Sequence, residues 1–204
     1  MNPVLEPYTV LEMTGSLEKD VAGFLTRHRR PKTAEHSINV GRKARELAAR
    51  FGADPDQAEA AGYLHDISAI YPNEERIEVS RQLGIEVLPE EELFPMIIHQ
   101  KMSRVMAREL FHVTDEPILS AVECHTTLKP GSSLMDRIVF VADKIAWDQQ
   151  GTPPYLDSLL DELDHSIAHA ALVYLEFLWD RRHNLKVLHP WAEAAYKELL
   201  AECR

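Results

Sequence analysis

The sequence predicts an all-α fold, a bundle of about eight or nine helices. Alanine, leucine and glutamate are abundant and glycine is scarce, with 8 residues in 204, a composition that favours helices. Apolar residues recur at steps of three and four, which is the spacing of an amphipathic helix. A chain of this length is most simply one domain, 1–204, with one substantial core.

The first two expected helices bring a histidine to a buried face. Residues 1–15 show little periodicity and predict an extension, followed by a helix over 16–28. Pro31 sits where a first-turn proline is favourable, and the next helix is expected over 33–51. His36 shares one face of that helix with the apolar residues Val40, Ala44, Leu47 and Phe51. We therefore expect its imidazole to point into the core.

The next expected helix, over 55–68, carries the adjacent pair His65-Asp66. Ala58 and Ala61 share a face with His65, and such small residues let a neighbouring helix approach closely. An imidazole and a carboxylate in an apolar wall are costly to bury unless something satisfies them. A metal ion is a common reason, although a single pair of this kind is more often solvated at a helix end.

Two later helices repeat the pattern of a histidine on an apolar stripe. After a polar loop over 84–91, a helix from Pro95 aligns His99 with Met102, Met106 and Leu110. The following helix, which opens at 115–117, aligns His125 with Ile118, Ala121 and Val122.

The apolar run 138–142 ends in Asp143. Such a run is compatible with a buried strand, but we assign it to a helix over 134–148 because no partner strand is evident.

The C-terminal part is expected to hold a long helix over 155–182 and, after a loop, a last helix from Trp191. His165 and His169 lie four residues apart on the long helix, with Asp161 one turn earlier, an arrangement that can chelate zinc. No further ligand cluster supports such a site, so a solvated helix face is the preferred interpretation.

Charge and cysteine content limit the partners. The net charge of -11 at pH 7 argues against nucleic acid or an anionic membrane as a partner. It leaves room for an anionic small molecule, because a bound cation can invert the local field. Cys124 and Cys203 are too few for a disulfide framework. Residues 1–14 lack a signal-peptide pattern and no apolar run approaches the ~20 residues of a membrane span, so we expect a cytoplasmic protein.

Histidine and aspartate on buried stripes of five expected helices indicate a metal site. One histidine on an apolar face is usually a satisfied core residue, but five such positions are harder to explain that way. Imidazole and carboxylate ligands without thiolate suit iron, manganese, cobalt or zinc better than calcium or magnesium. The positions are His36, His65-Asp66, His99, His125 and Asp143.

The ordered set resembles the H…HD…D signature of the HD-domain metal-dependent phosphohydrolases. Residues 61–66, AGYLHD, resemble the AGLLHD segment of that family. Residues 125–127, HTT, followed by 138–143, resemble the HTT…IIxxAD segment of one branch, and 188–190, LHP, resembles its IHP motif. That branch is the YqeK family of symmetrical bis(5'-nucleosyl)-tetraphosphatases, which split diadenosine tetraphosphate into two ADP. The resemblance extends from Lys32 to the C-terminus.

The resemblance implies an HD-type helical domain with a motif core over about 33–150 and C-terminal helices over about 155–203 packed on it. It implies a transition metal, typically iron, with manganese, cobalt or zinc as alternatives. The implied metal ligands are His36, His65, Asp66 and Asp143, and the implied catalytic residues are Asp66, His99 and His125. His99 and His125 either bind a second metal or donate hydrogen bonds to substrate phosphates, and the branch favours the phosphate role slightly. A homodimer is expected from the resemblance alone.

The substrate is expected to be a small nucleotide. Beside His99 and His125, we assign to its binding Thr126, as a hydroxyl donor, and the segment carrying Lys186, His189 and Trp191. Thr33 is assigned to the same set. For Trp191, packing in the core is an equally good interpretation.

Several neighbouring positions depart from the family pattern. Ala69 stands where a lysine is common, Gln100 and Leu128 replace glycines, and Lys144 and Gln149 follow Asp143 in place of other residues. Lys101, Lys129 or Lys144 could restore the lost positive charge, although a solvated lysine is the simpler expectation for each. Two alternatives to the tetraphosphatase therefore stay open: a mononucleotide phosphohydrolase, and a regulator that binds nucleotide or metal without turnover.

Overall fold

The computed structural model describes residues 2–10, 13–147 and 150–204. In these ranges it contains eleven α-helices, three short 3-10 helices and no strand, which confirms the all-α prediction. The α-helices are α1 (Leu17–Arg27), α2 (Pro31–Phe51), α3 (Pro55–Leu64), α4 (Asn73–Gln82), α5 (Pro89–Leu93), α6 (His99–Leu110), α7 (Glu116–Cys124), α8 (Leu134–Ile145), α9 (Leu156–Leu163), α10 (Ile167–Asp180) and α11 (Pro190–Glu202). The 3-10 helices are η1 (Pro3–Tyr8), η2 (Ile67–Ile70) and η3 (Arg182–Asn184). Among the helices of the described chain, none is both long and apolar enough to cross a lipid bilayer.

The expected number of eight or nine helices is too low for two reasons. The single helix expected over 155–182 is divided into α9 and α10, because the side chain of Ser166 accepts a hydrogen bond from the backbone N–H of His169 and caps a new helix. A short helix, α5, also begins at the end of the expected polar loop over 84–91, and Glu91 in that helix is fully buried.

Other element boundaries also differ from the expected ones. The helix expected to carry His65 ends at Leu64 rather than near Ser68, because the ring of His65, at the C-cap, bonds to the carbonyl oxygen of Gly62 and competes with the backbone for that acceptor. The N-terminal residues expected as an extension form η1, and its Leu5 is fully buried in the core.

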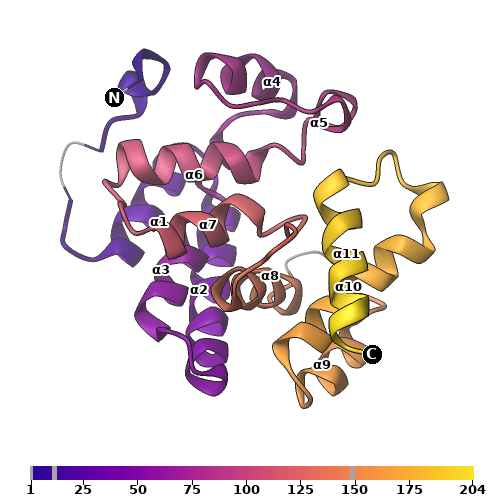
Figure 1. The fold of residues 1–204 in the computed structure, drawn as a ribbon. Coiled ribbons are helices and arrows are strands. Elements are labelled where there is room, and N and C mark those ends of the chain that lie inside the picture. Colours follow the sequence, from indigo (N-terminus) through magenta and orange to yellow (C-terminus); the bar gives the residue numbers. More distant parts are fainter. Residues whose placement is uncertain (1, 11–12, 148–149) are drawn as a thin grey trace.

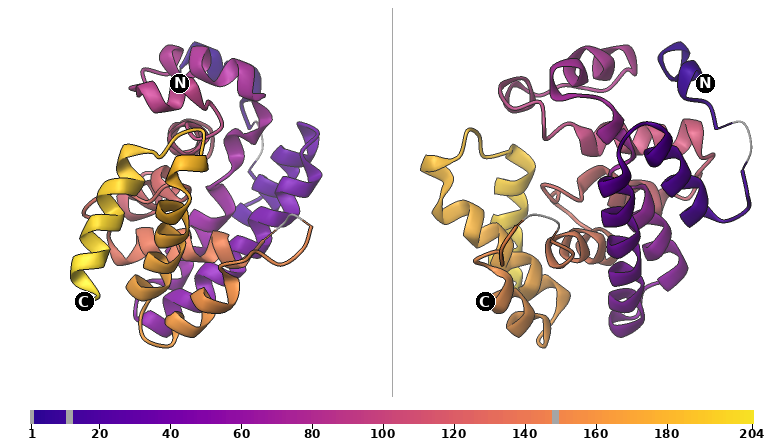
Figure 2. Two further views of the ribbon diagram at one scale, coloured as in Figure 1. Left: turned by 90° about the vertical axis from the view of Figure 1, so that its right-hand side faces the viewer. Right: turned by 180° about the vertical axis from the view of Figure 1, so that it is seen from behind.

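Helix α8 lies between the N-terminal helices and the C-terminal ones. It contacts α2, α3 and α7 on one side and α10 on the other. Figure 1 shows α9, α10 and α11 grouped beyond α8, while α4 and α5 lie beside the end of α6. The view from behind in Figure 2 shows the same separation of the C-terminal helices from α1, α2 and α3. Residues on α8 can therefore face both groups of helices.

Helices α2 and α3 cross at two glycines. A Cβ atom on Gly62 would lie 2.5 Å from Cα of Gly41, and one on Gly41 would lie 2.5 Å from the ring of Tyr63. Ala58 and Ala61, on the same helix, are fully buried. The close approach expected from the small residues is therefore observed, and it brings the end of α3 near the start of α2.

Candidate metal centre

Three histidines are held in one tautomer by backbone carbonyl groups. Nδ1 of His65, His99 and His125 lies 2.7, 2.5 and 2.8 Å, respectively, from the carbonyl oxygen three residues earlier. A carbonyl oxygen only accepts, so each Nδ1 carries a proton and each Nε2 of a neutral ring presents a lone pair. Backbone carbonyls commonly orient metal-binding histidines in this way.

The four predicted metal ligands come together from α2, the end of α3 and α8. Nε2 of His36 lies 3.1 Å from Oδ1 of Asp143. Nε2 of His65 lies 3.4 Å from Oδ2 of Asp66 and 3.6 Å from Oδ1 of Asp143. Nε2 of His65 is buried and has no hydrogen-bond partner in the described part of the chain. One ligand atom each from His36, His65 and Asp66 lies within 4.8 Å of the others, a spacing that one metal ion can span.

A second group of ligand atoms lies on the other side of Asp66. Its Oδ1 is 3.2 Å from Nε2 of His99 and 3.6 Å from Nε2 of His125. The two Nε2 atoms are 2.9 Å apart, and Oγ1 of Thr126 lies 3.1 Å from Nε2 of His99. One ligand atom from each of Asp66, His99 and His125 again falls within 4.8 Å of the others. Asp66 is thus common to both groups.

The four imidazole rings form a row. Ring centroids are separated by 5.1 Å from His36 to His65, by 4.7 Å from His65 to His125, and by 4.9 Å from His125 to His99. The row gives the site a long axis, with His36 at one end and His99 at the other.

The protonation states in the site suit cation binding. Burial alone raises the pKa of Asp66 and Asp143, yet both pKa values lie well below the usual range, and for Asp143 the charge of Lys144 is the main cause. Burial lowers the pKa of His65, and it lowers the pKa of His125 to about 4. Ionised carboxylates and neutral imidazoles are the forms in which these groups bind metals.

Lys144 is a buried member of the site, so the expectation of a solvated lysine is wrong there. Its Nζ donates to Oδ2 of Asp143 at 2.6 Å and to the carbonyl oxygen of His125 at 3.2 Å. It also lies 5.0 Å from the ring centroids of Phe140 and Tyr174. Burial lowers the pKa of Lys144, but the charge of Asp143 more than offsets this and the pKa is raised overall. Lys144 therefore stays a cation next to a predicted metal ligand.

Gln100, one of the departures from the family pattern, holds the turn that carries Thr126. Its Oε1 accepts hydrogen bonds from the backbone N–H groups of Thr126 and Thr127 at 3.1 and 3.2 Å, and its Nε2 donates to Oγ1 of Thr127 at 2.9 Å. Leu128, which follows, has a left-handed backbone with φ of 55°. Gln149, another departure, lies outside the described residues.

The ligand groups open into a cavity of about 300 Å³, here called the metal pocket. It is lined by His36, Asp66, Met96, His99, His125, Thr126, Asp143, Lys144, Trp147, Tyr155 and Tyr174. Sequence reasoning did not single out Met96, Trp147, Tyr155 or Tyr174. Methionine and aromatic residues at helical spacing look like ordinary core residues, and only the position of Trp147, four residues after Asp143, offered a signal.

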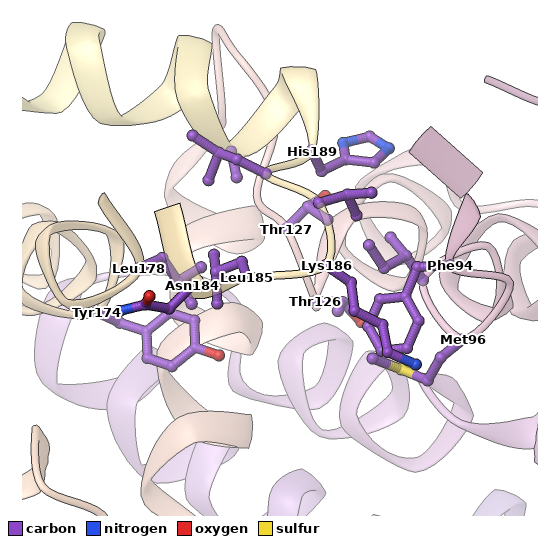
Figure 3. A pocket seen from close by; sticks show the side chains of 14 residues that line it. Phe94, Met96, Thr126, Thr127, Tyr174, Leu178, Asn184, Leu185, Lys186 and His189 are labelled. Atoms are coloured by element: carbon purple, nitrogen blue, oxygen red, sulfur yellow. The ribbon is translucent and has the colours of Figure 1, made fainter. Parts of the chain in front are cut away.

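A second cavity of about 330 Å³, the C-terminal pocket, adjoins the metal pocket. Figure 3 shows the side chains that line it. The two share Met96, Thr126 and Tyr174. Its walls are mostly apolar, and Nζ of Lys186 lies 5.0 Å from the centroid of the Phe94 ring. The pocket is lined by Phe94, Met96, Ile97, Thr126, Thr127, Tyr174, Leu178, Asn184, Leu185, Lys186, Val187, Leu188, His189 and Ala192.

The structure brings most, but not all, of the expected substrate-binding residues to these cavities. Thr126 lines both pockets, and Lys186 and His189 line the C-terminal pocket. Trp191 lines neither pocket and instead has Nζ of Lys101 4.9 Å from its ring centroid. Thr33 lies in the first turn of α2 and also lines neither. The substrate roles of these residues stay predictions.

A buried ion network holds the C-terminal segment in place. Nζ of Lys101 lies 2.9 Å from Oε1 of Glu91, and Nε2 of His189 lies 3.4 Å from the same oxygen. Nδ1 of His189 accepts a hydrogen bond from the backbone N–H of Trp191 and caps α11. Lys101 is therefore a structural cation here, again not the solvated lysine that was expected. The network joins α5 and α6 to the segment that forms one wall of the C-terminal pocket.

The alternative zinc site on the long helix loses its basis. His169 lies on α10, Asp161 on α9, and His165 in the turn between them, so the three residues do not share one helix. Among the described residues, the groups of three ligands close enough to hold an ion are the two that contain Asp66.

Comparison with known proteins agrees with the resemblance to the HD-domain family. The model of the HD domain family matches residues 33–148. An uncharacterised protein of Lactococcus lactis subsp. cremoris is 50% identical over 143 residues, which cover 70% of this chain and 72% of the relative. A symmetrical bis(5'-nucleosyl)-tetraphosphatase of Halalkalibacterium halodurans is 29% identical over 187 residues, or 89% and 94% of the two chains. A crystal structure from Clostridium acetobutylicum, described as a predicted HD superfamily hydrolase involved in NAD metabolism, matches with a TM-score of 0.82 and 26% identity over 90% of this chain and 97% of that one.

Proposed function

This chain belongs to the HD domain family of hydrolases, and we propose that it is a metal-dependent phosphohydrolase that splits diadenosine tetraphosphate symmetrically into two ADP. The observation that carries the proposal is the convergence of His36, His65, Asp66 and Asp143, with a second ligand group that shares Asp66. The name of the Halalkalibacterium relative supports the choice of substrate.

The residues present fit a transition metal. The buried Nε2 of His65 lacks a hydrogen-bond partner among the described residues, and a cation would satisfy its lone pair. The ligand atoms are imidazole nitrogen and carboxylate oxygen without thiolate, a set that suits iron, manganese, cobalt or zinc. We propose iron, held by His36, His65, Asp66 and Asp143.

The geometry favours a second cation at His99 and His125 over the phosphate role that the sequence slightly favoured. A neutral histidine that donates to a phosphate through Nε2 must carry its proton there. In both residues Nδ1 donates to a carbonyl oxygen, so Nε2 of the neutral ring can only accept. Two such nitrogens 2.9 Å apart are close to the spacing of neighbouring ligands on one metal with bonds of ~2.1 Å.

The chemistry then depends on charge and position. A transition metal held by His36, His65, Asp66 and Asp143 would supply a nucleophile near neutral pH, by lowering the pKa of water, and would polarise a phosphoryl oxygen. Asp66 belongs to both ligand groups and so fixes their relative position, and Lys144 orients the carboxylate of Asp143 by a hydrogen bond. Thr126 offers a hydroxyl at the boundary of the two pockets, and Lys186 offers a charge further along. The leaving ADP is a stable anion near neutral pH, so the reaction does not need a strong general acid.

Both the motif core, about 33–150, and the C-terminal helices, about 155–203, contribute to the proposed site. The C-terminal pocket is apolar with a few polar groups, as expected of a cavity that takes a nucleoside. Its junction with the metal pocket at Thr126 would let a phosphate chain run from the nucleoside to the metal ligands.

Product analysis tests the proposal. Purified protein loaded with iron or manganese is incubated with diadenosine tetraphosphate, and the nucleotides formed are separated by chromatography. The proposal predicts ADP alone. Formation of AMP with ATP contradicts symmetrical cleavage, phosphate release from mononucleotides supports a nucleotidase, and binding without products supports a regulator.

A further inference from the structure

A third cavity, the Trp147 pocket, adjoins the metal pocket at the end opposite to the C-terminal pocket. It has a volume of about 380 Å³ and is lined by Lys32, Glu35, His36, Asn39, Ala146 and Trp147. It shares His36 and Trp147 with the metal pocket. It shares no lining residue with the C-terminal pocket, which meets the metal pocket at Met96, Thr126 and Tyr174.

The two outer pockets lie at the two ends of the histidine row. His36, the first ring of the row, belongs to the Trp147 pocket. His99, the last ring, contacts Thr126, which lines the C-terminal pocket. Asp66 and its two ligand groups lie between them. A molecule that spans all three cavities would place its middle at the metal ligands and its two ends in the outer pockets.

Trp147 contributes an indole ring to the lining of the third cavity. The residue is 37% exposed, although an indole is a large apolar group. Its ring meets Tyr155 edge-on, with centroids 6.3 Å apart and planes at 85°. Tyr155 in turn packs edge-on against Tyr174 and Phe177. The indole is thus supported at one edge by an aromatic cluster while part of it stays open to the pocket.

The polar groups of the pocket suit a nucleoside joined to a phosphate. Lys32 supplies a positive charge at the wall, which a phosphate would neutralise. Asn39 and Glu35 supply amide and carboxylate groups that can bond to ribose hydroxyls or to the edge of a base. An aromatic platform next to a cation is the usual arrangement for a stacked base with its phosphate.

We propose that the Trp147 pocket binds the second nucleoside of a dinucleoside polyphosphate, with its base stacked on Trp147. The inference rests on the proposed function and refines it: the C-terminal pocket takes one nucleoside, the metal pocket takes the central phosphates, and the Trp147 pocket takes the other nucleoside. A mononucleotide would occupy only one of the outer pockets. The third cavity therefore distinguishes a substrate with two nucleosides from a substrate with one.

Binding measurements test the subsite without depending on turnover. Dissociation constants are measured by calorimetry with manganese-loaded protein for two ligands. The first is a diadenosine tetraphosphate analogue with a methylene group between the two central phosphates, which cannot be split symmetrically. The second is adenosine 5'-tetraphosphate, which has the same number of phosphates and one nucleoside. Three variants are compared with the wild type: Trp147→Ala, Trp147→Phe, and Leu160→Ala as a control at an exposed residue outside all three pockets.

The proposal predicts that Trp147→Ala weakens binding of the dinucleoside analogue by roughly tenfold, the size of one lost stacking contact. The same variant should weaken binding of adenosine 5'-tetraphosphate much less, because its one nucleoside can occupy the C-terminal pocket and only its phosphates reach the part of Trp147 that lines the metal pocket. Trp147→Phe should retain most of the affinity for the analogue. Equal losses for both ligands would show a merely structural role and overturn the subsite, as would an unchanged affinity for the analogue. Failure of the wild type to form ADP contradicts only the proposed reaction, because the affinity difference is read separately.

Discussion

Nε2 of His99 lies 2.9 Å from Nε2 of His125, and in the neutral form of each ring this nitrogen presents a lone pair, because Nδ1 of the same ring donates to a backbone carbonyl oxygen. Two lone pairs at this distance repel one another unless a positive charge lies close to both. Oδ1 of Asp66 is 3.2 Å from the first of these nitrogens. The relationship connects the metal-ligand prediction for Asp66 to two histidines whose role the sequence left open.

The first prediction concerns the number of metal ions. Elemental analysis of the wild type should find two transition-metal ions per chain, and His125→Ala should retain one because only one ligand group loses a member. Turnover of the variant should fall by about 10²–10³-fold, the range for removal of one group that stabilises transition-state charge. His165→Ala, at an exposed histidine outside the site, should keep both ions. A finding of one ion per chain in both the wild type and His125→Ala would contradict the proposal of a second cation.

Lys144 is predicted to stabilise the metal-free protein. Lys144→Met leaves the mostly buried carboxylate of Asp143 without its ammonium partner, and breaking a buried pair in this way destabilises by about 3–5 kcal/mol. For a chain of this size that corresponds to a fall in Tm of roughly 6 °C or more. Thermal unfolding in the presence of a chelator measures the effect, and added metal should reverse part of it. Lys129→Met, which removes a partly exposed ion pair with Glu123, should change Tm little. Equal Tm values for Lys144→Met and the wild type would show that Lys144 does not stabilise Asp143.

The Gly41–Gly62 crossing gives a prediction about packing. Gly62→Ala would place a Cβ atom 2.5 Å from Cα of Gly41, so α2 and α3 must move apart. Overpacking of this kind lowers the free energy of unfolding by about 1–3 kcal/mol, which urea unfolding can measure. Gly23→Ala is a matched control at an exposed position of α1, where nothing lies within 4 Å of the added atom. It should raise the free energy of unfolding by about 0.5–1 kcal/mol. A Gly62→Ala protein as stable as the wild type would contradict the tight crossing.

The candidate metal ligands, the α2–α3 crossing and Lys144 show what the sequence could and could not predict. The convergence of the candidate metal ligands could be predicted, because histidine and aspartate on an apolar stripe stand out from the helical period of the residues around them. The close approach of α3 to α2 could be predicted from the small residues of α3. The burial of Lys144 could not be predicted, because it depends on Asp143 together with Tyr174, which lies thirty residues further along the chain. The residues next to Lys144 in the sequence give no sign of the ring of Tyr174 that lies beside its ammonium group.

The division of the long C-terminal helix was missed for a similar reason. Ser166 and its neighbours are polar, and polar residues on a continuous helix face look like a solvated surface until a cap is formed. Trp191 illustrates the limit of motif reasoning, because it follows the LHP motif in sequence but contacts Lys101 rather than the pocket.

The buried network at Glu91 predicts a dependence of stability on pH. Burial alone would raise the pKa of Glu91. Hydrogen bonds from His189, from the backbone N–H of Leu88 and from Lys101 lower it by more than burial raises it, so the pKa lies below the ordinary value of 4.5. A lowered pKa means that the ionised group stabilises the fold. That contribution is complete above the ordinary pKa and is lost as the pH falls through the lowered one.

Glu91→Gln should therefore lower the free energy of unfolding at pH 7 by about 3 kcal/mol, because Lys101 loses its buried partner. The difference from the wild type should shrink as the pH falls below 4.5. Urea unfolding at a series of pH values measures both effects. Glu92→Gln, at an exposed position paired with Arg81, serves as the control and should show little difference at any pH. A gap between wild type and Glu91→Gln that widens in acid would contradict the sign of this shift.

The most direct test of the central claim is a paired measurement of bound metal and ADP formation in Asp66→Ala. Asp66 is common to both ligand groups, so its loss should remove the bound metal and the cleavage of diadenosine tetraphosphate together, while His165→Ala retains both. A variant that lacks Asp66 but keeps full activity would contradict the account.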